Sequence, residues 1–275
     1  MTSPCRLDSG TATEKSTGEP IHPSSQNSSQ FSIGLEVLPG GFYLEYMTID
    51  FNYKFEFADM FPLEFHVCLD AETGRLNLPS DLENEEWTDL DFNKCDHCPL
   101  NSNDHPSCPA AVGLGHMVQS FQDMKSFWET KITVTTKERV YLKETDVQTG
   151  LFSLFGLIMA SSGCPHMDFL RPMARFHLPF STVNETVMRV TSMYLLKQYY
   201  DAKKGISPDM ELKNLDELYK NVTKVNHSIL ERIRQVGHGD SKSNAVLILD
   251  SFAFLLTNEL SNDLSSLKEI FDSPL

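Results

Sequence analysis

The sequence predicts an α+β fold in which a small antiparallel β-sheet of two hairpins, with a cysteine-rich loop, precedes a mostly helical C-terminal half. Apolar and polar residues alternate strictly from Met47 to Phe57 and from Leu63 to Leu69, which is typical of half-buried strands. Helical spacing of apolar residues dominates the chain after Val147. Four cysteines follow the spacing C-x2-C-x9-C-x55-C, which indicates a metal site.

The composition is that of a globular chain with an acidic surface. At 275 residues, 40% of them apolar, the chain is long enough to bury a core in one large domain or two small ones. The formal net charge of −15 repels phosphate backbones and anionic lipids, so we expect neither a nucleic-acid partner nor a membrane. The apolar stretch Leu151–Ala160 is shorter than the ~20 residues of a membrane span. A protein partner is compatible with these features, and the oligomeric state is not indicated.

Residues 1–41 are expected to form a disordered tail. Residues 1–34 contain twelve Ser or Thr and few large apolar side chains, too little apolar surface to offset the entropy of ordering the backbone. This segment lacks the basic start and apolar run of a secretory signal, which favours a cytoplasmic protein. In that reducing compartment, six cysteines indicate metal binding or redox chemistry rather than structural disulfides.

Residues 42–146 are expected to hold the sheet, the cysteine loop and one helix. The two alternating segments are separated by Ala58–Met60, which predicts an antiparallel hairpin. A second, shorter hairpin is predicted from Ile132–Thr136 and Val140–Leu142. Between the hairpins, helical spacing predicts a helix from Pro109 to Phe127.

Residues 147–275 are expected to form a helical region packed on the sheet. Its first helix is almost wholly apolar and must be buried on most sides. A capping box at Thr182 and Glu185 opens the second. The expected helices are Val147–Ser162, one ending near Lys204, one with an apolar stripe from Leu215 to Ile233, and Ala245–Leu260.

The candidate metal ligands are Cys95, Cys98, Cys108 and Cys164. A thiolate is a soft ligand for zinc or iron–sulfur clusters, and a C-x2-C pair lets two sulfurs reach one metal from a tight loop. Cys108 is the expected N-cap of a helix that begins at Pro109, where the helix dipole stabilises a thiolate. The preceding Gly163 suits the end of an apolar helix and places Cys164 just beyond it.

An iron–sulfur cluster is the favoured cofactor, and zinc is the alternative. Three of the cysteines precede a proline, at Pro99, Pro109 and Pro165, as in the last step of the bacterial ferredoxin motif. The apolar segment before the last cysteine would keep a cluster dry. A zinc knuckle usually has glycine after its second cysteine, where this chain has proline, but spacing alone does not fix the metal. Nearby imidazoles could replace one sulfur, namely those of His97, His105 and His166.

The cysteine motifs also carry a resemblance to a known family. The runs Cys95-x-x-Cys98-Pro-Leu, Ser107-Cys108-Pro, Ser162-Gly163-Cys164-Pro and Arg171-Pro-Met-Ala-Arg-Phe-His-Leu-Pro-Phe180 resemble the signature of an uncharacterised bacterial family of domains of unknown function. The resemblance covers roughly residues 45–270. It implies a bacterial cytoplasmic protein with these cysteines as its signature, and it implies no activity.

The function expected from these observations is that of a cytoplasmic, cysteine-ligated metal-cluster protein with a redox or iron-sensing, regulatory role. A structural zinc-binding interaction module is the alternative, and an electron-transfer or thiol-redox enzyme is the second alternative. An enzyme is not favoured, because the common nucleotide-binding, metalloprotease and hydrolase motifs are missing, and no catalytic residue is predicted. Arg171 and Arg175 are expected to anchor packing rather than offset a cluster's charge.

Overall fold

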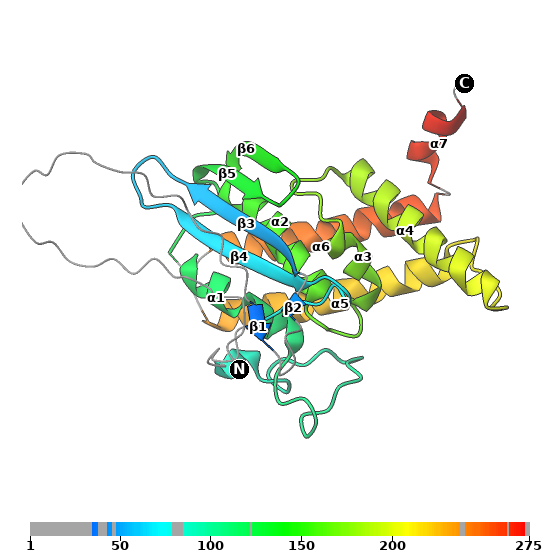
Figure 1. Ribbon diagram of the computed structural model, residues 1–275, viewed down its shortest axis with the longest axis horizontal. Helices are drawn as coiled ribbons and strands as arrows, with labels where there is room; N and C mark the ends of the chain where they lie inside the picture. The colour runs from blue at the N-terminus through cyan, green and yellow to red at the C-terminus, as the bar shows by residue number, and fades with distance from the viewer. Residues whose placement is uncertain are drawn as a thin grey trace, which may run out of the picture.

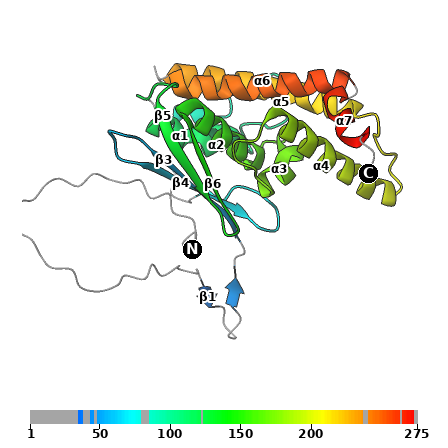
Figure 2. The same ribbon diagram turned by 90° about the horizontal axis from the view of Figure 1, so that it is seen from above.

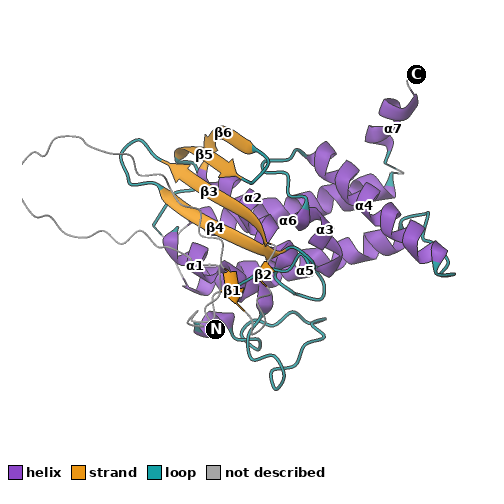
Figure 3. Cartoon of the chain, viewed as in Figure 1, coloured by secondary structure: helices purple, strands orange, loops and turns teal. Residues whose placement is uncertain are grey.

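The computed structural model describes residues 35–37, 43–45, 48–78, 85–121, 123–236, 240–262 and 264–272. It confirms the α+β class, with the strands on one side of the molecule and the helices on the other (Figure 1, Figure 3). The expected tail lies outside the described residues up to residue 34, whereas residues 35–37 form a short strand.

The main sheet is a single antiparallel layer with strand order β4-β3-β5-β6. Both predicted hairpins are present, and pairing of β3 with β5 joins them, which the sequence did not indicate. A separate two-stranded sheet is formed by β1 and β2. The strands are β1 Leu35–Val37, β2 Tyr43–Glu45, β3 Thr48–Glu56, β4 Leu63–Asp70, β5 Glu129–Thr135 and β6 Val140–Asp146.

The helices follow the predicted order, with differences at their ends. They are α1 Pro109–Ser120, α2 Val147–Ser161, α3 Arg171–Arg175, α4 Val183–Lys203, α5 Lys213–Val236, α6 Asp240–Ser261 and α7 Ser265–Asp272, with 3₁₀ turns η1 at Glu86–Thr88 and η2 at Asp168–Leu170. The first helix ends before the predicted Phe127, because Phe121 and Met124 are buried from a turn rather than from a helix. No helix among the described residues has both the length and the apolarity needed to cross a membrane.

The core lies between one face of the sheet and α1 with α2. On β3, Phe51, Tyr53 and Phe55 are at most 3% exposed, as the alternation in the sequence predicts. The ring of Phe121, at the end of α1, meets those of Phe55 and Phe65 at centroid distances of 5.1 and 5.4 Å. Aromatic contacts between sheet and helix therefore define this part of the core.

The apolar helix α2 is enclosed on several sides, as predicted. It begins at the N-cap Asp146, whose side chain accepts a hydrogen bond from the Thr149 amide at 2.9 Å. Seen from above, α2 lies between the sheet and α6, and α5 runs along α6 (Figure 2). The chain therefore has a layered arrangement in which α2 contributes to two interfaces.

The closest approach of α2 to the sheet occurs at Gly150. A Cβ atom at this position would meet Ile132 Cδ1 and lie 2.5 Å from Phe55 Cε1. We expect Gly150→Ala to lower the free energy of unfolding by about 1–3 kcal/mol, because the added methyl overpacks the core. Urea unfolding followed by circular dichroism measures the change.

The matched control for this substitution is Gly115→Ala in α1. A Cβ there would have no neighbour within 4 Å, so helix propensity alone should stabilise the protein, by up to about 1 kcal/mol. Equal effects of the two substitutions would show that α2 does not pack on the sheet in this way.

Candidate functional site

The cysteine loop connects η1 to α1, and its two ends are tied together. The amide of Leu90 donates to the Pro106 carbonyl at 2.8 Å, and the amide of Cys108 donates to the Thr88 carbonyl at 2.7 Å. These bonds hold Cys108 at the start of α1, where it is the N-cap with extended backbone, as predicted. The remainder of the loop extends from this point along the lower edge of the molecule in Figure 3.

Within the loop, Cys95 and Cys98 share one tight turn. The amide of Cys98 donates to the carbonyl of Cys95 at 3.0 Å, and the ammonium of Lys94 donates to the Leu100 carbonyl at 2.6 Å. Both cysteines are half-buried, and neither is in a disulfide. The turn therefore presents two free thiols from one short segment.

The last cysteine lies directly after α2, as predicted. Gly163 adopts a φ of 89°, which allows the chain to leave the helix, and Cys164 is 7% exposed. Burial raises the pKa of the Cys164 thiol to about 12, although the amides of His166 and Met167 donate to its sulfur and oppose this shift. Two backbone donors at one sulfur prepare it to carry negative charge once a metal displaces its proton.

The loop and the turn after α2 are in direct contact. His166 Nε2 donates to the carbonyl of His97 at 2.9 Å, and the two imidazole rings lie with centroids 4.0 Å apart. His105 lies in an exposed turn of the loop instead. The contact brings segments together that are more than sixty residues apart in the sequence.

The thiols of Cys95, Cys98, Cys108 and Cys164, which we call the four-cysteine cluster, are close enough for their charges to interact. Burial is the main cause of the raised pKa of Cys95, and the thiols of Cys108 and Cys98 add to it. The pKa of Cys164 responds in the same way to Cys108 and Cys95. Within the described residues, however, no three His, Cys, Asp or Glu side chains are grouped so as to hold a metal ion. Metal ligation at the four-cysteine cluster therefore stays a prediction.

An arginine that the sequence analysis missed lies beside the cluster. Arg232 of α5 is only 1% exposed, and its guanidinium donates to the carbonyls of Trp87, Asp89 and Leu90 at 2.6, 2.7 and 3.0 Å. Burial lowers its pKa, and the thiols of the cluster are among the groups that raise it. The sequence did contain one sign that Arg232 is buried: it lies two turns after Val225, on the apolar stripe of α5.

Ser228, one turn before Arg232 on α5, also faces the loop. Its hydroxyl donates to the carbonyl of Asn93, and a hydrogen bond between its side chain and Cys95 lowers the pKa of that thiol. One face of α5 therefore supplies both a cation and a hydroxyl to the loop that carries the first two cysteines.

Arg171 and Arg175 have the anchoring role that the sequence favours. Arg171 donates to the carbonyl of Thr73 at 3.3 Å, and Arg175 donates to the carbonyl of Ala71. An ion pair of 3.2 Å between Arg75 and Asp168 joins the same segments. These arginines attach the turn after β4 to α3, and none of the cysteine pKa shifts involves them.

Comparison with known proteins identifies a family but no activity. No curated protein and no solved structure matches the chain at a significant level. The model of a family described as "Domain of unknown function (DUF6901)" matches residues 51–272, which include the four-cysteine cluster, Arg232 and the whole main sheet except its first residues. The chain belongs to the DUF6901 family of domains of unknown function.

Proposed function

We propose that the four-cysteine cluster binds a thiolate-ligated metal centre, that this centre is an iron–sulfur cluster, and that it gives the protein a redox or iron-sensing, regulatory role. The observation that carries the proposal is the buried guanidinium of Arg232 beside the thiols of Cys95, Cys98 and Cys108. The elevated pKa values of Cys95 and Cys164 leave these thiols protonated at neutral pH when no metal is bound.

The charge of Arg232 needs a negative partner. Burying a cation is costly unless it is paired, and no ion pair joins Arg232 to a carboxylate among the described residues. Three backbone carbonyls solvate its guanidinium but carry no net charge. A metal centre with four thiolate ligands carries net negative charge, so its formation would supply the missing partner.

The arrangement of the thiols supports a cluster over a single ion. Sulfur ligands of one zinc ion lie about 3.5–4 Å apart, whereas those around a four-iron cubane lie somewhat over about 6 Å apart. The charges of Cys108 and Cys98 contribute to the raised pKa of Cys95, and those of Cys108 and Cys95 contribute to the raised pKa of Cys164. Thiols that interact from separate segments would suit the larger centre.

Zinc remains the second candidate because of one specific feature. The turn from Cys95 to Cys98, closed by a hydrogen bond of 3.0 Å, holds two thiols on one short segment, as structural zinc sites require. A zinc site would make the protein a structural interaction module instead of a sensor.

A sensing role follows from where the ligands come from. Cys95 and Cys98 lie in the loop, Cys108 begins α1, and Cys164 follows α2, so one centre would link the loop to the helical half. Loss of the centre would release the loop and expose its contact with α5, which a partner protein could read. The four free thiols of the cluster fit a reducing compartment, which is the cytoplasm in this proposal, whereas Cys68 is in a disulfide, contrary to the expectation from the sequence.

Anaerobic purification tests the metal. We expect a brown protein that absorbs near ~400 nm, with iron and acid-labile sulfide by chemical analysis. Cys164→Ser should remove the colour and lower the stability of the protein by several kcal/mol, because metal binding contributes folding free energy.

Cys68→Ser serves as the control for metal content, because Cys68 lies in strand β4, is disulfide-bonded and is not a predicted ligand. It should keep the metal. A colourless protein that contains about one zinc per chain would show that the site binds zinc and not an iron–sulfur cluster. A protein that binds neither metal, in which Cys164→Ser has no effect on spectra or stability, would overturn the proposal.

Arg232→Gln tests the charge argument. It should lower the free energy of unfolding of the metal-loaded protein by about 2–4 kcal/mol, and that of the stripped protein by less, because only the loaded form gives Arg232 a negative partner. Denaturant unfolding of both forms measures the two penalties.

Arg234→Gln is the matched control on the same helix. Arg234 is half-exposed and pairs with Glu231 at 2.8 Å, so its loss should change stability by less than about 0.5 kcal/mol in either form. If Arg232→Gln lowers the free energy of unfolding equally with and without metal, Arg232 only holds the loop through its hydrogen bonds and is not the charge partner of a metal centre.

A further inference from the structure

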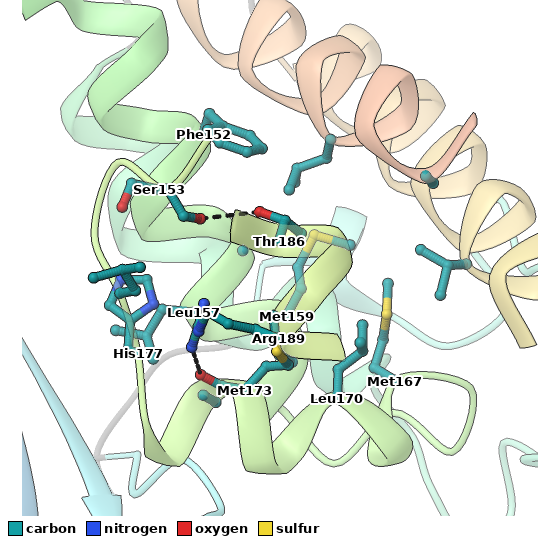
Figure 4. Close-up of a pocket in the computed structure, with 18 of the residues that line it drawn as sticks. Phe152, Ser153, Leu157, Met159, Met167, Leu170, Met173, His177, Thr186 and Arg189 are labelled. Atoms are coloured by element: carbon teal, nitrogen blue, oxygen red, sulfur yellow. Dashed lines mark hydrogen bonds between the residues drawn. The ribbon is translucent and has the colours of Figure 1, made fainter. Parts of the chain in front are cut away.

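A cavity of about 140 Å³ lies among α2, α3, α4, α5 and α6 (Figure 4). For comparison, an engineered apolar cavity of about 150 Å³ holds a benzene molecule. The walls are predominantly aliphatic, aromatic and thioether side chains from helices and turns, including Phe152, Leu157, Met159, Met167, Leu170 and Met173. The cavity is therefore large enough for a small apolar molecule, and its methionines can adapt to the shape of that molecule.

Arg189 of α4 gives this apolar cavity a positive charge. Among the described residues that line it, Arg189 is the only charged side chain. One terminal nitrogen of its guanidinium donates to the carbonyls of Met173 and Phe176. Figure 4 shows Arg189 lying beside Met173 at the wall of the cavity, joined to its carbonyl.

The charge of an acidic group on the same helix raises the pKa of Arg189, but the two side chains are not directly paired among the described residues. Glu185 lies one helical turn before it, but its carboxylate accepts hydrogen bonds from the amide and hydroxyl of Thr182 in the capping box. No ion pair with Arg189 occurs among the described residues. The guanidinium is half-buried, and burial is the main cause of its lowered pKa. A ligand carboxylate would offer the charge and the planar geometry that a guanidinium recognises.

A second donor in the wall is a buried side-chain amide. Asn226 of α5 is 2% exposed and lines the cavity, and its Nδ2 makes no hydrogen bond with any residue that the structure describes. An unpaired buried donor costs about 1–3 kcal/mol, and an acceptor bound in the cavity would remove that cost. Thus Arg189 and Asn226 both place N–H donors in the wall, and no carboxylate from the described residues lines the cavity.

Several other polar groups of the wall already have hydrogen-bond partners. The hydroxyl of Tyr53 lies 2.5 Å from His177 Nε2 and 2.9 Å from Ser153 Oγ, and Ser181 and Thr186 bond to each other at 3.1 Å. Burial lowers the pKa of His177 to about 3, so this imidazole is neutral at physiological pH. The charge of the cavity therefore comes from Arg189.

We propose that this cavity binds a small, mainly apolar monocarboxylate, with Arg189 holding the carboxylate, Asn226 supplying a further donor, and the methionine and leucine side chains enclosing the apolar body. This binding site is distinct from the proposed metal site, because none of the four cysteines lines the cavity.

The test titrates benzoate, and separately hexanoate, into the full-length protein by isothermal calorimetry. We expect saturable binding of at least one of them. Benzamide has the same shape as benzoate without the charge, and it should bind at least about tenfold more weakly. Arg189→Gln should weaken carboxylate binding by at least about tenfold, whereas the surface control Arg234→Gln should leave it unchanged.

A second variant covers the outcome in which Arg189→Gln fails to fold. Asn226→Leu removes the unpartnered amide, so it should leave the thermal midpoint equal or higher while weakening carboxylate binding. Absence of saturable binding by both probes would overturn the proposal. Equal affinities for benzoate and benzamide, or full affinity in a folded Arg189→Gln protein, would also overturn it.

Discussion

The burial of α2 between the sheet and α6 is the constraint on which the other features depend. Its residues are apolar on nearly all sides, so the helix is stable only when other elements cover each face. At Gly150 it approaches the sheet so closely that no side chain fits, and farther along it supplies Leu157 and Met159 to the cavity. Its end delivers Cys164 to the cysteine loop. One helix therefore fixes the sheet, the cavity and the cysteine cluster relative to one another.

The two candidate sites have one feature in common: each contains an arginine that forms no ion pair with a carboxylate among the described residues. Arg232 is almost fully buried and is solvated by three carbonyls, so the negative partner proposed for it is a metal centre built from the protein's own thiolates. Arg189 lines an apolar cavity and keeps donors available, so the partner proposed for it is a ligand from outside. The chain has 38 Asp and Glu residues against 23 Lys and Arg, so a shortage of carboxylates does not explain why one buried and one half-buried guanidinium lack an ion pair among the described residues. A carboxylate at either place would remove the reason for the arginine to attract anything else.

Short-range patterns explain which features the sequence could predict. Strict alternation predicted the buried face of β3, with Phe51, Tyr53 and Phe55 inward, and the capping box at Thr182 predicted the start of α4. Pairing of β3 with β5 has no local signal, because it depends on how two hairpins dock after α1 is inserted between them. The cysteines were visible as a motif. Arg232, by contrast, takes its role from carbonyls more than a hundred residues away, and a single charged residue in an amphipathic stripe does not reveal its partners.

The turn after α2 is where the two sites meet. The amide of Met167 donates to the sulfur of Cys164, while the side chain of Met167 lines the cavity. The proposed metal would strengthen that amide bond, because a charged acceptor binds an N–H more strongly than a neutral thiol does. A stronger hydrogen bond at the backbone of Met167 would also restrict the movement of its side chain in the cavity wall. If the turn has two arrangements, thermodynamic linkage requires that each site bias the other by the same factor. Cys164 and Met167 are close in sequence, so the backbone of this one turn would transmit the coupling. No chain of contacts through other elements would be required.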